Sequence, residues 1–421
     1  MHQLYWNHSP FIKSLSLNFE YFFARRMTFF SQRKASALVV RLAIISIMLA
    51  VATMEIALSF VQGFEEEIQK KVIGFGSHIQ IGNYFQELDK ETIPLDRTEP
   101  AIDSIRAMEF VSSVQAVVQV WSVCKSESGW DGVWLKGVDS TYDWTFFQTV
   151  LKEGALPDYG EGGDKKGILI SRKQARSLQL KVGDKAIFLF LGETLRRRQV
   201  VVRGIYETGM EEFDTNIIIC DMRLLQRIRK WDADEVSGFE VNLTSLEMIE
   251  PASFLIGEEL PYTYGLEPIT HLFPEIFDWL QLQHQNVWVI LVLMIIVAVI
   301  NMTSVMLILI IERTRTVGIL KAIGLPNYRV RRMFVWYAFF LILIGLIAGN
   351  VLGLGLLASQ DYFEWLRVNQ EDYFIETVPV AWVWGRFLLV NLGVILICTF
   401  AMLIPTLIVN RITPLKAIRF E

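Results

Sequence analysis

Few side chains in this sequence are spaced for chemistry. No two of the five histidines lie four residues apart, as a helical metal site requires; they are His2, His8, His78, His271 and His284. The sequence has no GxSxG nucleophile elbow and no HExxH motif. The glycine-rich segment 160–167 does not fit the GxxxxGK[ST] loop that binds phosphates. We therefore predict that the chain is not an enzyme and binds no metal or cofactor, so that any ATP and Mg would be held by another subunit.

Glu55 is the strongest single candidate for a functional side chain. It lies within a long apolar segment, and a carboxylate at membrane depth is costly and by default functional. The alternative is that Glu55 snorkels to the outer interface or is protonated near it. No second carboxylate or histidine lies at such depth, which argues against a proton-relay transporter.

Composition excludes several classes of protein. Three cysteines in 421 residues exclude a disulfide-dense scaffold, and a formal net charge of −5 gives no support for nucleic-acid binding. Cys398 lies in an apolar run. Cys124 and Cys220 lie in the polar middle of the chain, where they could pair or remain buried free thiols.

The elements that position these residues are mostly membrane helices. The chain is 52% hydrophobic with a mean hydropathy of +0.36, and its apolar residues are concentrated in four stretches. Each stretch exceeds the about 20 residues that span a bilayer as a helix; they are residues 38–61, 287–311, 334–358 and 382–409. We therefore predict a membrane α-helical protein with four transmembrane helices and a large mixed α+β extracytoplasmic domain, residues 62–283, between the first and second.

The charges of the short flanks predict the orientation. Residues 1–37, 312–333 and 410–421 are rich in Lys and Arg, whereas residues 359–381 are acidic. Positive flanks stay in the cytoplasm. Both termini and the 312–333 loop are therefore expected in the cytoplasm, and the domain and the short 359–381 loop in the periplasm. Residues 16–30 are expected to form an amphipathic helix at the inner interface or to extend the first span.

The spans contain two further patterns. Gly345, Gly349 and Gly353 present a face without side chains, which lets another helix approach closely. Three polar residues of the second span, Asn301, Thr303 and Ser304, are explained by hydrogen bonds to a neighbouring helix. Pro405 should kink or end the fourth span.

The domain alternates between strand and helix patterns. Strands are expected at 78–81, 114–123, 133–138, 168–170, 185–191, 199–206, 217–220 and 238–243, and helices at 171–180 and 222–231. A turn is expected at Val182-Gly183-Asp184. This order is typical of a mixed α+β fold.

The loop after the second span predicts a short coupling helix. Its apolar strip lies beside Arg313, Arg315 and Lys321 and should end at Gly324, with Pro326 just beyond. The strip comprises Gly318, Ile319, Leu320, Ala322 and Ile323. An apolar ridge with a charged rim suits docking into a groove of a soluble partner. The alternative is an amphipathic helix on the lipid surface.

Several segments together resemble a known family. The chain is similar to the MacB-like (type VII) ABC permeases, which include LolC, LolE and FtsX, and most similar to the LolC/LolE lipoprotein-releasing permeases. The matching segments are 58–74 (LSFVQGFEEEIQKKVIG), 204–214 (GIYETGMEEFD), 277–324 (which includes 299–302 and ERTRTVGILKAIG) and 409–421 (VNRITPLKAIRFE). The matches keep their order over almost the whole chain.

The resemblance implies a function. It implies a permease subunit that extracts lipoproteins from the outer leaflet of a Gram-negative inner membrane, driven mechanically by a separate ABC ATPase dimer. The coupling element that contacts the ATPase would comprise Glu312, Arg313, Thr314, Gly318, Ile319, Leu320, Lys321, Ala322 and Gly324. A second permease, identical or paralogous, is also implied. The alternatives are a MacB-like exporter of peptides or drugs, disfavoured by the lack of a fused ATPase, and an FtsX-like regulator of a cell-wall hydrolase, disfavoured by the large domain.

Two features depart from the family pattern. In LolC-type subunits a proline-containing hairpin captures the periplasmic lipoprotein carrier, whereas here the two strands are joined by residues 192–198, GETLRRR, without proline. Direct capture of a carrier is therefore not expected. Glu55 also replaces the apolar residue usual at that site.

Overall fold

The computed structural model describes residues 20–22, 24, 34–85, 93–190 and 196–411. It divides into two units. The helical unit comprises Met1–Phe64, Gln281–Leu366 and Val378–Glu421, and the α+β unit comprises Glu65–Leu280 and Arg367–Thr377. The predicted interfacial helix at 16–30 lies mostly outside the described residues.

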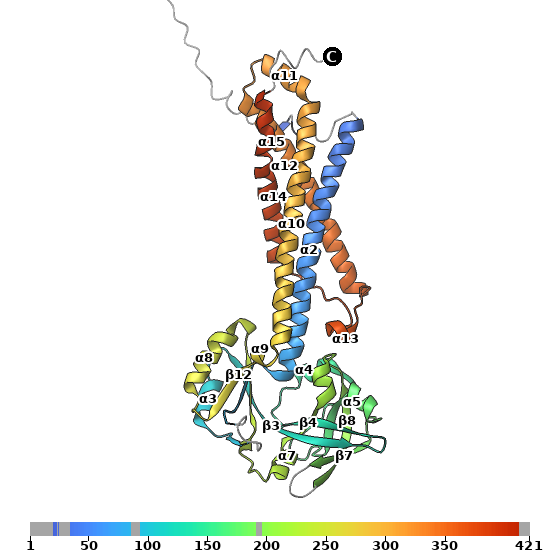
Figure 1. Ribbon diagram of the computed structural model, residues 1–421, viewed down its shortest axis with the longest axis vertical. Helices are drawn as coiled ribbons and strands as arrows, with labels where there is room; N and C mark the ends of the chain where they lie inside the picture. Colours follow the sequence, from blue (N-terminus) through green and yellow to red (C-terminus); the bar gives the residue numbers. More distant parts are fainter. Residues whose placement is uncertain (1–19, 23, 25–33, 86–92, 191–195, 412–421) are drawn as a thin grey trace, which may run out of the picture. The chain divides into compact units, whose positions relative to one another are not determined.

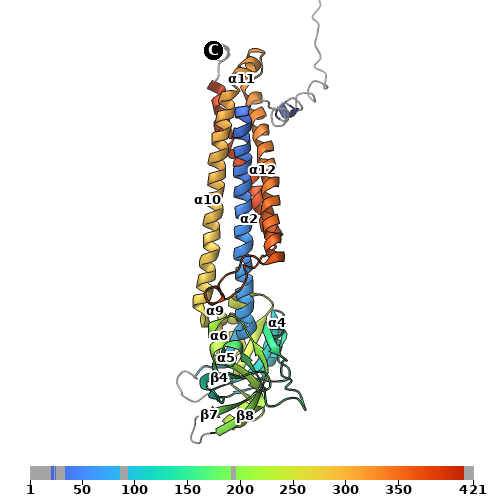
Figure 2. The same cartoon turned by 90° about the vertical axis from the view of Figure 1, so that its right-hand side faces the viewer.

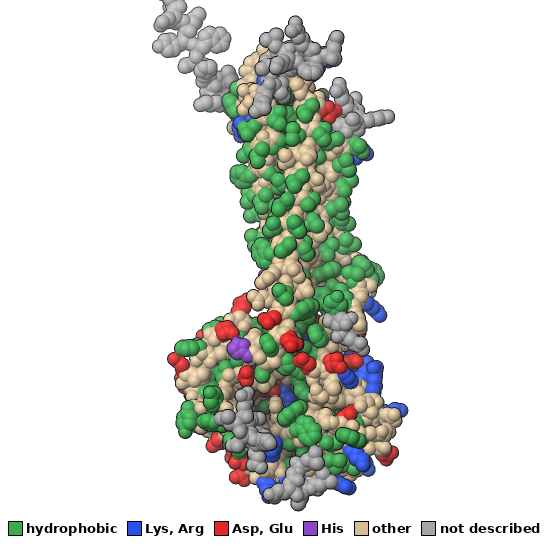
Figure 3. Space-filling view, in the orientation of Figure 1, with side chains coloured by type: hydrophobic (Ala, Val, Ile, Leu, Met, Phe, Trp, Pro, Cys, Tyr) green, Lys and Arg blue, Asp and Glu red, His purple; other side chains and the backbone are tan. Residues whose placement is uncertain are grey.

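Four long helices form the helical unit and run side by side (Figures 1 and 2). They are α2 (Lys34–Gly76), α10 (Pro274–Glu312), α12 (Asn327–Phe363) and α14 (Trp384–Ala401). Among the described residues, these are the helices long and apolar enough to cross a membrane. Their lipid-facing surface is covered with hydrophobic side chains (Figure 3). The prediction of four transmembrane helices is confirmed.

Three of these helices, α2, α10 and α12, are longer than the predicted spans, and the first two extend furthest. Helix α2 has 43 residues and α10 has 39, whereas a bilayer requires about 20. Both α2 and α10 cross from one unit into the other, because the unit boundaries fall after Phe64 and Leu280. The sequence did not predict these extensions of α2 and α10, because residues 62–76 and 274–286 are polar enough to resemble loops.

Helices α2 and α12 pack through three glycines of α12. A Cβ added to Gly345 would lie 2.8 Å from the Cβ of Ile47, and one on Gly349 would lie 2.8 Å from the Cβ of Val51. A Cβ on Gly353 would lie 2.5 Å from Glu55 Oε2. The paired positions rise together in steps of four, so the two helices run parallel in constant register. We call these contacts the glycine seam; such close approach is what small residues in membrane helices permit.

The fourth membrane helix breaks before Pro405. Helix α14 ends at Ala401 and is followed by α15 (Leu403–Thr406) and the 3₁₀ turn η2 (Leu407–Arg411). A proline ring clashes with the carbonyl group four residues earlier, which here belongs to Ala401. The predicted single span over 382–409 therefore ends in short helical pieces.

A mixed sheet forms the core of the α+β unit. The strand order is β12-β1-β11-β3-β4-β9-β6-β8-β5, with β7 paired to β3 and β8. The strands are β1 (Ile79–Asn83), β3 (Val111–Lys125), β4 (Trp130–Val138), β5 (Leu151–Gly154), β6 (Gly167–Ser171), β7 (Lys185–Phe190), β8 (Arg196–Tyr206), β9 (Ile217–Asp221), β11 (Gly238–Leu243) and β12 (Tyr264–Pro268). A separate pair is formed by β2 (Leu95–Asp96) and β10 (Glu235–Val236).

The long strand β3 holds the two halves of this sheet together. Residues 111–117 pair with β11, and residues 118–125 pair with β4. Most pairs are antiparallel, but β4–β9 and β6–β8 are parallel. The predicted mixed α+β class is confirmed.

Short helices cover the sheet. They are α3 (Pro100–Arg106), α4 (Thr145–Val150), α5 (Arg172–Ser177), α6 (Glu211–Asn216), α7 (Met222–Arg229), α8 (Ile249–Glu259) and α9 (Ile269–Leu272). Ser171 caps α5 by accepting from Gln174 N, and the Gln174 side chain accepts from Ser171 N in a capping box. The sequence predicted α5 and α7 but not α3, α4, α6, α8 or α9.

Two predicted features of this unit concern its cysteines and one of its hairpins. Cys124 and Cys220 are buried free thiols, and burial raises the pKa of Cys124 to about 12. Strands β7 and β8 pair as far as Phe190 and Arg196. The loop expected at 192–198 is therefore shorter, because β8 begins at Arg196.

The glycine seam predicts a difference between two glycines of α12. Gly349→Ala should lower stability by about 1–3 kcal/mol, because its Cβ would press on Val51 and on Met48 O. Gly355→Ala is the matched control, since its Cβ would meet no atom within 4 Å. It should be neutral or stabilise the chain by up to about 1 kcal/mol. Thermal unfolding of the purified chain in detergent measures both, and equal effects would contradict the seam.

Candidate functional site

The short helix after α10 is present and has a well-formed end. Helix α11 spans Thr314–Ala322. Gly324 has a φ of +97°, which glycine adopts without strain. Its N–H donates to Lys321 O, and Leu325 N–H donates to Leu320 O, both at 3.0 Å. These two bonds make a Schellman motif, which ends α11 before α12 begins.

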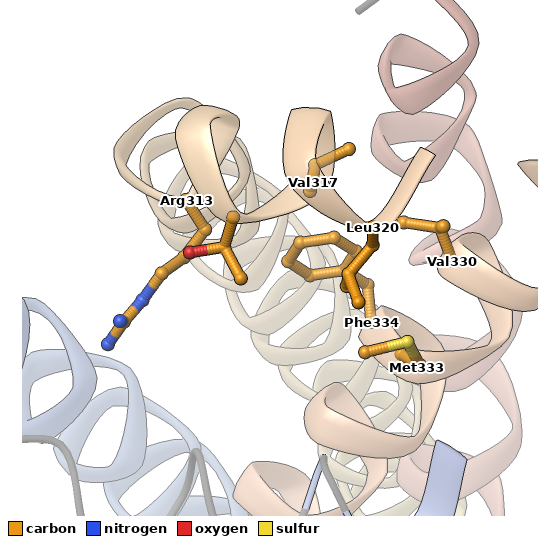
Figure 4. Close-up of a pocket in the computed structure, with 7 residues that line it drawn as sticks. Arg313, Val317, Leu320, Val330, Met333 and Phe334 are labelled. Atoms are coloured by element: carbon orange, nitrogen blue, oxygen red, sulfur yellow. The ribbon is translucent and has the colours of Figure 1, made fainter. Parts of the chain in front are cut away.

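One face of α11 packs on α12 (Figure 4). Val317 and Leu320 of α11 meet Val330, Met333 and Phe334 of α12 around a small apolar pocket. Arg313 also lines this pocket, but its side chain extends away from the apolar group. Apolar packing therefore holds α11 rigidly against the start of α12.

The exposed face of α11 is narrower than the sequence suggested. Ile319 is 47% exposed and Ile323 is 80% exposed, with Ala322 and Arg315 also exposed beside them. Gly318 is buried and Leu320 faces α12, so neither belongs to the outward ridge. The expectation of an outward strip was wrong for these two, because Leu320 packs against α12 and Gly318 is buried. We call Arg315, Ile319, Ala322 and Ile323 the α11 face.

Polar side chains of this segment donate hydrogen bonds to backbone carbonyl groups of neighbouring turns. Lys321 Nζ donates to Val409 O at 2.5 Å and so ties α11 to η2. Burial lowers the pKa of Lys321. Thr314 Oγ1 donates to Ile311 O at 2.6 Å, at the C-terminus of α10, where carbonyl groups lack helical partners. Glu312, the last residue of α10, is half-buried. Lys321 is therefore a structural tie and not part of the exposed rim.

A polar cluster lies inside the helical unit around Glu55. The Glu55 side chain is fully buried, and its Oε1 accepts from Asn391 Nδ2 of α14 at 3.2 Å. Within the described residues, Glu55 Oε2 has no hydrogen-bond partner. Gly353 leaves room for this oxygen. Glu55 is thus enclosed between helices and does not snorkel out of the unit.

Asn391 and Asn350 complete this cluster. Asn350 Nδ2 donates to Asn391 Oδ1 at 2.6 Å, and Asn391 Nδ2 is 3.1 Å from Asn350 Oδ1. The three side chains join α2, α12 and α14, and we call them the polar cluster. Neither asparagine was predicted from the sequence as a functional residue. An amide side chain inside a long apolar segment is the feature that could have identified both.

The polar residues that were singled out in α10 have other partners. Asn301 Nδ2 donates to Ser46 Oγ of α2 at 2.6 Å, as expected for a bond between neighbouring helices. Ser304 Oγ instead donates to Ile300 O of its own helix. Neither joins the polar cluster.

In the α+β unit, Asp214 organises the turn within 204–214. It accepts from Thr208 N, from Thr208 Oγ1 and from Gly209 N at 2.9–3.1 Å. Burial raises the pKa of Asp214, against the opposing effect of these hydrogen bonds. Gly209 has a φ of +78° and makes the turn possible.

This turn supports the connection between α12 and α14. Segment Arg367–Thr377, which contains α13 (Gln370–Tyr373), belongs to the α+β unit. Lys71 Nζ, near the end of α2, donates to Phe374 O at 2.7 Å, and a Cβ on Gly209 would lie 3.0 Å from the same oxygen. The sequence predicted a short loop over 359–381, and nothing in an acidic segment indicates what it packs against.

The polar cluster predicts energetic coupling between two residues. Asn391→Leu should cost about 1–3 kcal/mol, because it removes the hydrogen bond to buried Glu55. The double change Glu55→Leu with Asn391→Leu should cost less than the sum of the single changes by about 1 kcal/mol or more. Thermal unfolding of the four proteins measures this. Asn301→Leu combined with Glu55→Leu is the control and should be additive; additivity in the first pair would argue against the cluster.

Comparisons with known proteins cover nearly the whole chain. Residues 41–258 match the MacB-like periplasmic core domain family, and residues 288–414 match the FtsX-like permease C-terminal family. The lipoprotein-releasing system transmembrane protein LolC of Neisseria meningitidis serogroup B is 25% identical over 406 residues, which are 90% of this chain and 93% of that protein. LolE of Haemophilus influenzae is 21% identical over 407 residues, covering 91% and 94%.

Solved structures align with part of this chain. The periplasmic region of MacB from Actinobacillus actinomycetemcomitans aligns 96% of its chain with 49% of this one, at 11% identity and a TM-score of 0.34. The match to the MacB-like periplasmic core domain family covers more than half of the 421 residues. The chain therefore belongs to the permeases that combine a MacB-like periplasmic core domain with an FtsX-like permease domain.

Proposed function

We propose that this chain is the permease subunit of an ATP-driven complex that releases lipoproteins from the inner membrane of a Gram-negative bacterium. The observation that carries the proposal is the match to relatives named LolC and LolE over about nine-tenths of the chain. The order of elements supports it, because a large α+β unit lies between the first and second membrane helices, and the periplasmic core match precedes the permease match along the chain.

The orientation follows from charge. The residues around α11 include Arg313, Arg315 and Lys321, and the start of α12 adds Arg329, Arg331 and Arg332. Basic flanks are retained in the cytoplasm. In this proposal α11 and both termini face the cytoplasm, and the α+β unit and segment Arg367–Thr377 face the periplasm.

Energy enters at the α11 face in this proposal. A separate ABC ATPase dimer holds ATP and Mg and docks its groove on Ile319, Ala322 and Ile323, which are exposed and apolar. The opposite side of α11 is packed on α12 (Figure 4), so a push on α11 moves α12 with it. The chain itself contributes binding and movement, and no covalent chemistry.

The movement reaches the α+β unit along α2 and α10. Both helices are continuous across the unit boundary, so a tilt of either helix is passed on without an intervening loop. The glycine seam joins α2 to α12, which is the helix that α11 contacts. Lipoproteins enter from the outer leaflet between two facing permeases, of which this chain is one.

The periplasmic carrier is not proposed to bind the β7–β8 hairpin of this chain. Only residues 191–195 connect the two strands, and they include no proline. A carrier would have to engage the second permease or another surface.

Depletion of this protein in its own organism tests the function. We expect outer-membrane lipoproteins to accumulate in the inner-membrane fraction, and re-expression of the chain to restore their sorting. The measurement is membrane fractionation followed by detection of several lipoproteins. Normal sorting would overturn the proposal. Normal sorting with increased sensitivity to a peptide or drug would favour an exporter, and altered activity of a cell-wall hydrolase would favour a regulator.

A further inference from the structure

The last turn of α2 runs directly into the sheet of the α+β unit. Helix α2 ends at Gly76, and β1 begins at Ile79, so only Ser77 and His78 separate them. Ser77 has a φ of +62°, and its N–H donates to Ile73 O at 2.7 Å. His78 N–H donates to Val241 O of β11 at 3.1 Å. The short link therefore leaves the end of α2 little freedom to move relative to β1.

A buried ion pair lies beside this turn. Lys136 Nζ of β4 is 2.6 Å from Glu240 Oε1 of β11, and the two side chains are 5% and 3% exposed. Ser77 Oγ lies 3.5 Å from Glu240 Oε2. Burial disfavours the charge of Lys136, but Glu240 and Tyr142 together outweigh this effect, so the pKa of Lys136 is raised and the lysine stays charged.

Lys136 contacts α2 as well as its carboxylate partner. Its Nζ donates to Phe75 O at 2.9 Å, and this carbonyl belongs to the last turn of α2. The same nitrogen lies 5.4 Å from the centre of the Phe75 ring and 5.5 Å from that of Tyr142. Carbonyl groups of a final helical turn lack helical partners and carry partial negative charge, so a buried cation stabilises them.

Stability alone does not account for this arrangement. Removing two charges from water costs free energy that offsets much of their mutual attraction. Well-packed apolar side chains of similar volume often stabilise a core equally well. An ion pair differs from apolar packing in being directional, because Lys136 must keep both Glu240 and Phe75 O within hydrogen-bond distance. A rotation or a shift of α2 against the sheet breaks one of these contacts.

We propose that Lys136 and Glu240 form a joint that fixes the direction of α2 relative to the sheet, so that movement of α2 is passed to the α+β unit and is not lost at the helix end. Lys136 is a positioning residue in this proposal and contacts no substrate. The effect of the joint on the position of the helix end does not depend on the function of the chain. Its use in lipoprotein release rests on the function proposed above.

The first test measures the joint independently of function. Spin labels at Lys70→Cys on α2 and Trp121→Cys on β3, both exposed positions of the α+β unit, report the angle of the helix end in the full chain. Lys136→Met with Glu240→Met replaces the ion pair by apolar side chains. We expect an unchanged thermal midpoint and a distance distribution roughly twofold broader. The control is Arg172→Met with Glu207→Met, a pair at 2.8 Å in the same unit, which should leave the distribution narrow.

The second test measures coupling in the complex with its ATPase. The double variant should hydrolyse ATP at the unmodified rate but release about tenfold less lipoprotein per ATP. A narrow distance distribution in the double variant would overturn the joint, as would an unchanged release per ATP. Loss of folding in both this variant and Glu240→Asp would also overturn it, because the pair would then serve stability. Absence of release by the unmodified complex would overturn the proposed function and leave the distance test decisive for the joint.

Discussion

The structure depends on the close approach of α2 and α12 along the glycine seam. Lipid tails are as apolar as the side chains, so there is no hydrophobic driving force between membrane helices. The helices therefore associate through close packing and internal hydrogen bonds. Gly345 and Gly349 bring the two backbones together, and Gly353 does the same while making room for the Glu55 carboxylate. Glu55 reaches Asn391 of α14 from that position. One row of glycines thus holds two helices together and allows a polar cluster that adds a third.

Each unit contributes one feature to the proposed function. In the helical unit, α11 is packed on α12 by Val317 and Leu320 and offers Ile319 and Ile323 to solvent. In the α+β unit, the last turn of α2 meets the joint of Lys136 and Glu240. Helices α2 and α10 are continuous between these features, and Glu55 and Asn350 both bond to Asn391. Continuous helices suit the transfer of movement that we propose.

The sequence was informative where one pattern has one physical cause. Four long apolar runs, a glycine every fourth residue and a Gly324 stop with Pro326 beyond predicted the spans, the close-packing face and the end of α11. The sequence was silent where the outcome depends on distant contacts. Asn350 and Asn391 are single amides until the fold brings them to Glu55. Leu320 resembled a surface residue until the fold placed it against α12, and Gly318 resembled one although it is buried. Likewise, the polar extensions of α2 and α10 are helical because they pack, not because their hydropathy requires it.

The central claim is that energy from a separate ATPase enters this chain at the α11 face. Co-purification of the ATPase partner with the Ile319→Asp, Ile323→Asp double variant tests it most directly. The account predicts about tenfold or greater loss of bound ATPase, because two exposed apolar anchors become charged. Leu255→Asp, at a residue of α8 that is 43% exposed, is the matched control and should retain the ATPase. Full retention of the ATPase, with normal hydrolysis, by the α11 variant would contradict the account.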